Sequence, residues 1–190
     1  ASELFRTVCR KVIETDAATA EVAKLAENTF RDVNIALANQ LALVCERIGV
    51  DVTEVIKLAN THPRVNIHNP SPGVGGPCLP KDPYLLLHAT HLVGPNLVNT
   101  ARQVNDSMPE HMENLVLQAL ENSGKDMKRA RITVLGTSYK ADVDDARGSP
   151  SEPLIRGLIN KGFEVLAYDP RCNEAFGAKM VAFVNKAVEN

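Results

Sequence analysis

The sequence has no block of basic residues and no long apolar run. Its 190 residues include 21 Lys and Arg against 23 Asp and Glu, with both signs interspersed and a formal net charge of −2. This balance argues against a nucleic-acid groove or a patch for a membrane surface. The apolar runs are far shorter than a transmembrane span, and the N-terminus lacks the pattern of a signal peptide. We therefore expect neither a nucleic acid nor a membrane among its partners.

Paired cysteines are also lacking. The four cysteines are scattered along the chain, at Cys9, Cys45, Cys78 and Cys172. None belongs to a C-x-x-C motif, so neither a zinc site nor a redox pair is indicated, and we expect no metal. A reduced, cytoplasmic compartment fits unpaired thiols of this kind. Because the chain starts at Ala1 rather than at a methionine and ends at Asn190 on no recognisable stop, we expect it to be a piece of something longer.

The glycine fingerprint of dinucleotide-binding folds, G-x-G-x-x-G, does not occur anywhere in the sequence. The nearest candidate is G-V-G-G at residues 73–76, but no strand is expected before it and Cys78 occupies the third glycine position. No internal repeat and no low-complexity segment is present either. We therefore expect no site for the phosphates of a dinucleotide within these residues.

What the chain does contain is enough apolar sequence for a core. Hydrophobic residues make up 44% and charged residues 23%, which is typical of a soluble globular protein of one domain or two small ones. From about Thr19 to Ile48, apolar residues recur at steps of three and four, the period of a helix that buries one face. Such a helix is roughly 45 Å long. The stripe comprises Val22, Leu25, Val33, Leu37, Leu41, Val44 and Ile48.

A second helix is predicted from Asp51 to about Asn60, because D-V-T-E is typical of a helix start. The segment 61–82 that follows is rich in proline and glycine, and its length by itself indicates a functional loop. Asp82 and Pro83 match an N-cap and a first helical position, so they predict a short helix over 84–91. A further helix is expected over 95–122, kinked or restarted at Pro109.

The pattern changes after Gly124, where a polar connector is expected. R-I-T-V-L-G-T-S-Y-K at 131–140 predicts a buried strand that runs into a loop, 152–160 predicts a helix, and F-E-V-L-A-Y-D-P at 163–170 predicts a second strand. A strand–helix–strand unit pairs its strands in parallel. We therefore expect a helical region to about residue 126 and then the beginning of an α/β unit.

Lys24 and Asn28 lie at positions i and i+4 of the predicted long helix, so they share one face with Arg31. A cation and an amide placed in this way can both donate hydrogen bonds to an oxygen that becomes negative during a reaction. The alternative is an ordinary solvated polar edge, and the spacing does not decide between the two.

Cys78 stands in the stiff sequence G-V-G-G-P-C-L-P-K-D-P-Y, followed closely by Lys81 and Asp82. A nearby cation favours the reactive thiolate, and a carboxylate can act as a base toward water. The alternative is a small buried hydrophobe in a turn. A cysteine hydrolase is a further alternative, because His62 or His68 can serve as the base beside the thiol.

The remaining polar candidates are an arginine, two histidines and a charged loop. Arg64 lies in T-H-P-R-V-N, and Lys140 and Arg147 lie in S-Y-K-A-D-V-D-D-A-R, just past a strand end, where α/β sheets bind ligands. Solvated loop charges are the alternative. His88 and His91 can share a metal in principle, but no third ligand stands at a suitable spacing, so both are taken as ordinary helix residues.

Three stretches in this order resemble the UDP-sugar 6-dehydrogenase family: AEVAKLAENTFRDVNIALANQ, GVGGPCLPKDPY and VLGTSYKADVDDARGSPS. The resemblance covers the chain from about residue 20 to 170. It implies a four-electron oxidation of the sugar C6 alcohol to the acid, with two NAD reduced. The form L-P-K-D-P, preceded by N-I-H-N-P-S-P-G-V-G-G, is closer to the N-acetylhexosamine branch than to the glucose branch, so UDP-N-acetyl-D-mannosamine is the expected substrate and UDP-glucose the alternative.

The resemblance also implies roles for individual residues. The family's nucleophilic cysteine matches Cys78, its oxyanion-stabilising lysine and asparagine match Lys24 and Asn28, and its loop aspartate matches Asp82, an assistant in thioester hydrolysis. Residues implied to contact the substrate are Arg64 (reaching the neighbouring subunit's substrate), Gly75, Gly76 and Lys140. Arg147 matches an arginine near the cofactor.

The implied fold is mainly α: a long-helix dimerisation domain, similar to the C-terminal domain of 6-phosphogluconate dehydrogenase, then a partial Rossmann-like α/β unit. The expected divisions are 1–19, the tail of an NAD domain; 20–126, the helical domain with the cysteine loop; and 127–190, part of a UDP-sugar domain. The family's NAD is bound mainly by an N-terminal domain whose fingerprint this sequence lacks. A homodimer through the long helix is also implied.

Overall fold

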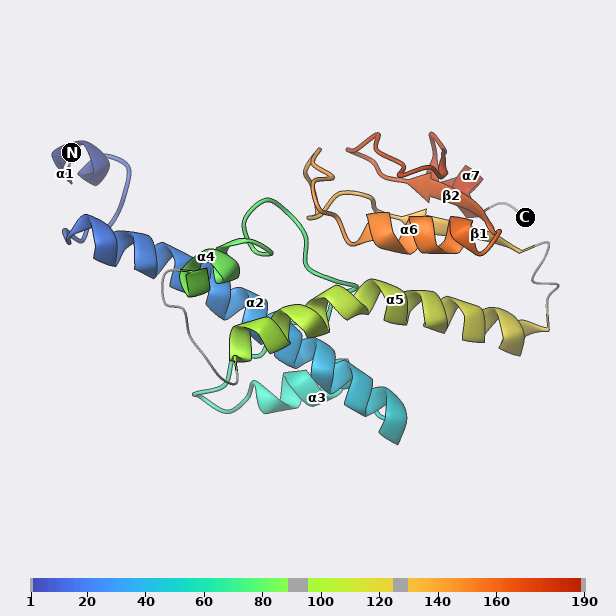
Figure 1. Ribbon diagram of the computed structural model, residues 1–190, viewed down its shortest axis with the longest axis horizontal. Helices are drawn as coiled ribbons and strands as arrows, with labels where there is room; N and C mark the ends of the chain where they lie inside the picture. Colours follow the sequence, from blue (N-terminus) through green and yellow to red (C-terminus); the bar gives the residue numbers. More distant parts are fainter. Residues whose placement is uncertain (1, 89–95, 125–129, 189–190) are drawn as a thin grey trace.

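The computed structural model describes residues 2–88, 96–124 and 130–188. They form a helical layer with a small α/β unit on one side of it (Figure 1). The helices are α1 (Ser2–Arg6), α2 (Ala17–Ile48), α3 (Val52–Ala59), α4 (Asp82–His88), α5 (Leu97–Ser123), α6 (Ser151–Asn160) and α7 (Val184–Val188). The strands are β1 (Arg131–Leu135), β2 (Glu164–Tyr168) and β3 (Lys179–Met180).

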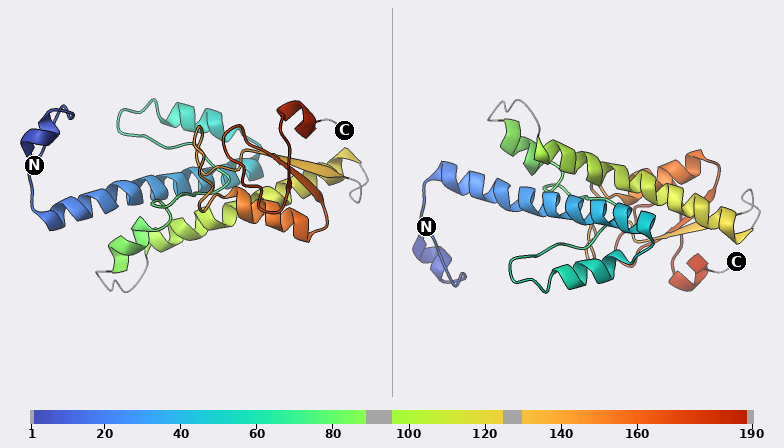
Figure 2. Two further views of the ribbon diagram at one scale, coloured as in Figure 1. Left: turned by 90° about the horizontal axis from the view of Figure 1, so that it is seen from above. Right: turned by 90° about the horizontal axis from the view of Figure 1, so that it is seen from below.

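The helical layer is built on α2 and α5, which lie side by side in the views of Figure 2. The carboxylate of Asp16 accepts a hydrogen bond from the Thr19 N–H at 2.9 Å and starts α2. Gly49, with φ of 74°, ends it in the left-handed conformation that glycine adopts without strain. The predicted long helix is therefore confirmed, and its 32 residues span about 48 Å.

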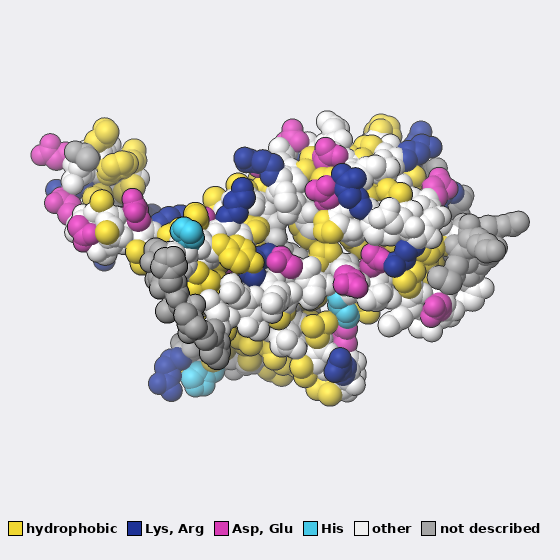
Figure 3. Space-filling model, in the orientation of Figure 1, with side chains coloured by type: hydrophobic (Ala, Val, Ile, Leu, Met, Phe, Trp, Pro, Cys, Tyr) yellow, Lys and Arg dark blue, Asp and Glu magenta, His cyan; other side chains and the backbone are white. Residues whose placement is uncertain are grey.

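The apolar stripe predicted to be buried on α2 is largely exposed. Val22 is 52%, Leu37 50% and Ile48 66% exposed, so this part of the prediction is wrong for the chain by itself. Figure 3 shows hydrophobic side chains on the surface over α3 and the nearby end of α2. No helix among the described residues is both long and apolar enough to cross a membrane. The face of α2 that is buried carries small and polar side chains: Asn28, Thr29, Asp32, Ala36, Ala38, Asn39, Ala42 and Cys45.

Polar residues are buried on α2 because α5 supplies their partners. Asp32 accepts a hydrogen bond of 2.5 Å from Arg102, and both side chains are buried. Asn105 donates to the Asp32 carbonyl and carboxylate at 3.0 and 2.9 Å, while Arg102 also contacts Asp106. Burial raises the pKa of the Asp32 carboxyl, and the charge of Arg102 offsets this only in part. The two helices are thus joined by a buried polar network rather than by an apolar seam.

The α/β unit has a three-stranded parallel sheet in the order β1-β2-β3. Arg131 pairs with Glu164 and Leu135 with Tyr168, which confirms the predicted parallel strand–helix–strand unit. Only β2 is buried; β1 is half-buried, because it forms an edge of the described sheet, so its predicted burial is wrong. The core comprises Ile155, Leu158, Val165, Ala167 and Phe176. The short elements α1, β3 and α7 have no counterpart in the sequence predictions.

The α/β unit packs on the helical layer through a close contact between α5 and α6 (Figure 1). The Glu113 carboxylate of α5 reaches α6 at Gly157, where an added Cβ would lie 2.0 Å from Oε2. Lys161, just past α6, pairs with Glu113 at 2.7 Å. The expected domain boundary at residue 126 lies outside the described residues, as do the polar connector over 125–129, His91 and Pro95.

Candidate active site

The cysteine loop lies directly on the loop that follows β1. The Gly76 N–H donates to the Arg147 carbonyl at 3.0 Å. A Cβ on Gly75 would lie 2.5 Å from the Gly148 carbonyl oxygen, and one on Gly76 would lie 2.7 Å from the Tyr139 ring. The glycines therefore permit a close approach of two chain segments. The contact of these two glycines with a substrate stays a prediction.

Cys78 is exposed in a tight turn that leads into α4. Its carbonyl accepts hydrogen bonds from the N–H groups of Lys81 and Asp82, both at 2.9 Å. Asp82 is not the N-cap that the sequence predicted, since the carbonyl of Lys81 accepts from Tyr84 and Asp82 is the first residue of the helix. The turn holds the backbone of Cys78 and leaves its thiol accessible.

Asn28 on α2 and Asp82 on α4, two of the predicted catalytic residues, are in contact although they are far apart in the sequence. Asn28 Nδ2 donates to Asp82 Oδ2 at 2.5 Å. Asn28 is only 5% exposed, so it offers Asp82 a rigid partner on α2. The side-chain amide has a second N–H, and no residue in the described part of the chain accepts from it. The contact explains why Asp82 does not cap its own helix.

Lys24 is not brought to the thiol by any described contact. Its ammonium group pairs with Glu27 at 3.0 Å, with both side chains about two thirds exposed, at 64% and 67%. An exposed pair of this kind contributes little to stability, so the lysine can exchange Glu27 for another anion at small cost. Lys24 lies one turn before Asn28, as predicted, and its role in catalysis stays a prediction.

Arg147 forms a fork with Asp145 on the loop after β1, with N···O distances from 2.6 to 3.1 Å. The hydrogen bonds from Arg147 lower the pKa of Asp145. Asp145 in turn raises the pKa of Arg147, chiefly through the hydrogen bond and also through its charge. Lys140 lies exposed on the same loop.

Asp169, directly after β2, organises this end of the sheet and was not found from the sequence. Its Oδ2 accepts from the N–H groups of Thr137 at 2.8 Å and Ser138 at 3.0 Å, and its Oδ1 accepts from Arg171 at 2.8 Å and Cys172 at 3.0 Å. Burial alone would raise the pKa of Asp169, but these backbone hydrogen bonds outweigh it and hold the pKa well below its usual range. An aspartate at a strand end, followed by proline, was the available signal.

The histidines proposed for a hydrolase are engaged elsewhere. His62 Nδ1 accepts from the Arg64 N–H at 3.3 Å, and the His68 ring stands edge-on to Phe30 with centroids 6.2 Å apart. No hydrogen bond joins either ring to Cys78 in the described part of the chain. Arg64 itself is exposed at the far end of the loop. The same residues contain no group of three or more metal-ligating side chains.

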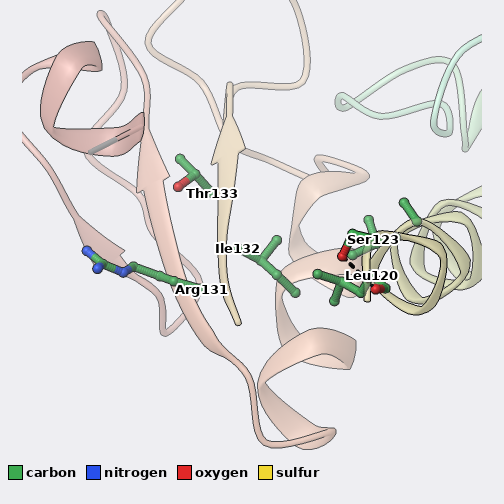
Figure 4. Close-up of a pocket in the computed structure, with 7 residues that line it drawn as sticks. Leu120, Ser123, Arg131, Ile132 and Thr133 are labelled. Carbon is green, nitrogen blue, oxygen red and sulfur yellow. Dashed lines mark hydrogen bonds between the residues drawn. The ribbon is translucent and has the colours of Figure 1, made fainter. Parts of the chain in front are cut away.

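A cavity of about 350 Å³ lies between the end of α5 and β1, and none of the predicted site residues lines it. In Figure 4, Ile132 points from β1 toward Leu120 and Ser123, whereas Arg131 and Thr133 lie on the other side of the strand. This is the alternation expected along a strand. The cavity is thus a packing feature between α5 and β1, apart from the cysteine loop.

The sequence matches one protein family in two segments. Residues 18–107 match the central domain of the UDP-glucose/GDP-mannose dehydrogenase family, and residues 133–190 match the UDP binding domain of that family. The chain belongs to this family. The contact of Gly75 and Gly76 with the loop after β1 is therefore a contact between the central domain and the UDP binding domain.

Individual relatives agree with this assignment. UDP-N-acetyl-D-mannosamine dehydrogenase of Methanococcus vannielii is 44% identical over 174 residues, which are 91% of this chain and 40% of the relative. The protein of the same name from Pyrococcus horikoshii is 49% identical over 172 residues, 90% of this chain and 41% of that protein. The chain thus spans about 40% of the length of these curated relatives.

A solved structure supports the fold as well. The UDP-D-ManNAc dehydrogenase of Pyrococcus horikoshii superposes with a TM-score of 0.86 at 44% identity, covering 99% of this chain and 45% of that one. The predicted fold class, a long-helix domain followed by a partial α/β unit, is confirmed by this similarity and by the elements described above.

Proposed function

We propose that this chain is the central part of an NAD-dependent UDP-N-acetylhexosamine 6-dehydrogenase, with UDP-N-acetyl-D-mannosamine as its substrate. The observation that carries the proposal is the docking of the Cys78 loop on the loop after β1, through Gly76 and Arg147, in a chain whose relatives have this activity by name. The nucleophile thus stands beside the segment that matches a UDP binding domain.

The proposed chemistry uses the thiol as a covalent carrier. The first hydride transfer converts the C6 alcohol to an aldehyde, which Cys78 attacks to give a thiohemiacetal. Loss of a second hydride leaves a thioester, and water then releases the carboxylate and the free thiol. Two molecules of NAD, each accepting one hydride, supply the oxidising power. The free N–H of Asn28 and the ammonium of Lys24 stabilise the oxyanion, and Asp82 takes the proton from water.

The described residues do not themselves build a site for NAD. The amides after β1, at Thr137 and Ser138, are where a strand–loop–helix phosphate site would offer its donors, and both donate to Asp169. We therefore place NAD on residues other than those described here, with only Arg147 of this chain beside it. Its exposed guanidinium group, 71% accessible, suits a phosphate.

The proposed substrate contacts come from both segments of the chain. Lys140 would bind the nucleotide sugar by its charge, and Gly75 and Gly76 would let the sugar approach the loop backbone. Arg64, exposed in the turn after α3, would reach the substrate of a neighbouring subunit. The exposed apolar stripe of α2 supports a homodimer formed through this helix, because a second copy would cover it.

The proposal is tested with the protein that carries this chain, incubated with NAD and a panel of UDP-sugars. We expect formation of the acid and of two NADH per sugar, fastest with UDP-N-acetyl-D-mannosamine. Cys78→Ser should abolish acid formation, and a variant with both His62 and His68 replaced should keep it. A preference for UDP-glucose would move the chain to the glucose branch, and an acid yield that survives Cys78→Ser would refute the covalent mechanism.

A further inference from the structure

Asparagine side chains hold the proline- and glycine-rich loop in place. Asn34 of α2 accepts from the His68 N–H at 2.8 Å and donates to the Asn66 carbonyl at 2.7 Å. Asn60, the C-cap of α3, accepts from the Ile67 N–H at 2.8 Å and donates to its carbonyl at 2.9 Å. The two amides together therefore hold the backbone of three successive residues, 66–68.

Asn39 makes the contact with the loop that is closest in sequence to Cys78, and the side chain of Asn39 is fully buried. Its Oδ1 accepts from the Ser71 N–H at 2.8 Å, and its Nδ2 donates to Asn105 Oδ1 at 2.9 Å. The orientation of Asn105 is fixed in turn, because its own Nδ2 donates to Asp32. The oxygen of Asn39 therefore has to face the loop, and the buried network of α2 and α5 determines where Ser71 lies.

From Ser71 the restraint passes along the loop. The Ser71 hydroxyl donates to the Gly73 carbonyl at 2.6 Å. Gly73 is buried, and a Cβ there would lie 2.7 Å from Pro150, so the loop packs closely on Pro150 and no larger residue fits at this position. Gly76 then binds Arg147 through its N–H, and the turn at Cys78 follows. The chain leading to the thiol is held at successive points, the first of them on α2.

We propose that Asn39 and Ser71 are positioning residues for Cys78. They touch neither thiol nor substrate, and they act by fixing the path of the loop that presents the nucleophile. This inference rests on the proposed function. A displacement of about 1 Å in a reacting group can cost about a hundredfold in rate, so loosening the loop should slow the covalent step while leaving nucleotide binding intact.

Ser71 provides the milder test, because the residue is only half-buried and its hydroxyl group bonds within the loop, to Gly73. In the protein that carries this chain, Ser71→Ala should lower kcat about tenfold or more, with the KM for the UDP-sugar changed less than about twofold. Ser71→Thr keeps the hydroxyl and should retain wild-type kcat. Ser107→Ala is the matched control, since it removes a serine hydroxyl bond of 2.8 Å to a carbonyl of α5, away from the loop.

Asn39→Leu keeps the size of the side chain but removes both of its hydrogen bonds. We expect a fall in kcat at least as large as for Ser71→Ala, together with a lower Tm. If this variant does not fold, the Ser71 pair decides the question. A Ser71→Ala or folded Asn39→Leu enzyme with wild-type kcat, or a Ser71→Thr enzyme as slow as Ser71→Ala, would overturn the proposal. Failure of the wild-type protein to form acid would instead count against the proposed function.

Discussion

Asn28 and Asp82 are 54 residues apart in the sequence, yet their side chains share a hydrogen bond of 2.5 Å. Because Asn28 is buried on a long helix, it fixes the carboxylate directly after the turn at Cys78. One carboxylate oxygen of Asp82 accepts from the amide, and no residue in the described part of the chain donates to Oδ1. The pair therefore gives the carboxylate a fixed position, which the role proposed for Asp82 in water activation requires.

Gly76 shows how much depends on one missing methyl group. Its φ is +91°, and a Cβ would lie 2.7 Å from the Tyr139 ring. We expect Gly76→Ala to lower the free energy of unfolding by about 1–3 kcal/mol, measured by urea denaturation. Gly124→Ala is the control, because Gly124 has φ of +65° but no described residue lies within 4 Å of an added Cβ. Equal losses in the two variants would mean that Tyr139 moves aside without cost.

Asp169 should make the stability of the chain depend on pH in the acid range. Its pKa in the folded protein is held below that of an unfolded aspartate, about 3.9. Below that value the unfolded state binds more protons than the folded state, so stability falls as the pH falls toward the folded pKa. Asp169→Asn should lower the free energy of unfolding at neutral pH. Urea denaturation at a series of acid pH values should also show a smaller loss of stability than in the wild type. An Asp169→Asn variant that loses as much stability in acid as the wild type would contradict this prediction.

At the scale of elements, the sequence was sufficient to predict the extent of α2 but not the face that it buries. Periodicity marks where a helix runs, and the caps at Asp16 and Gly49 confirm its ends. The buried face depends on α5, since Asp32 pairs with Arg102, which lies 70 residues further along the sequence. No local pattern reports such a partner. An apolar stripe identifies a surface that requires cover, and here the described chain does not supply it.

The candidate site divides in the same way. Cys78, Asn28 and Asp82 stand in compact motifs and were predicted together. Asp169 and Asn39 were missed. Some of their partners are backbone N–H groups of distant segments, at Thr137 and Ser138 for Asp169 and at Ser71 for Asn39. Local sequence does not identify such partners, although the aspartate–proline pair after β2 was a signal for Asp169. The short strand β3 and the helices α1 and α7 were missed for a simpler reason: they are too short for a periodic pattern.

The buried pair between α2 and α5 gives a prediction about the joint of these helices. Arg102→Met would leave the Asp32 carboxylate buried without a counter-charge, at a cost of about 3–5 kcal/mol in the free energy of unfolding. Replacing both residues, by Asp32→Leu with Arg102→Met, should recover much of the loss, because neither charge then remains buried. A double variant as unstable as the single one would show that the pair also supports the helices through its hydrogen bonds to Asn105.

At the scale of the whole molecule, Cys78 lies where two family segments meet. The central segment contributes the cysteine loop, and the UDP-binding segment contributes Tyr139, Arg147 and Gly148, against which that loop packs. A second contact, between Glu113 and the α6 region, holds the same two segments together. In Figure 1, α1 lies at one end of the molecule, and α7 lies toward the opposite end, beside β2. The thiol is thus presented at a junction that both segments must complete.

The last prediction is that these 190 residues alone oxidise no sugar, although the groups proposed for the covalent step belong to them. Hydride transfer requires a nicotinamide held within van der Waals contact of the sugar carbon, and a phosphate site normally fixes the dinucleotide. The sequence has no glycine fingerprint, and the amides of Thr137 and Ser138 are bound to Asp169. The purified chain, mixed with NAD and the panel of UDP-sugars, should produce no NADH by absorbance. Iodoacetamide should nevertheless label exposed Cys78 faster than buried Cys45, which would show that the loop is folded and the thiol accessible. Steady NADH production by the chain would reveal a dinucleotide site among these residues and would contradict the role assigned to Asp169.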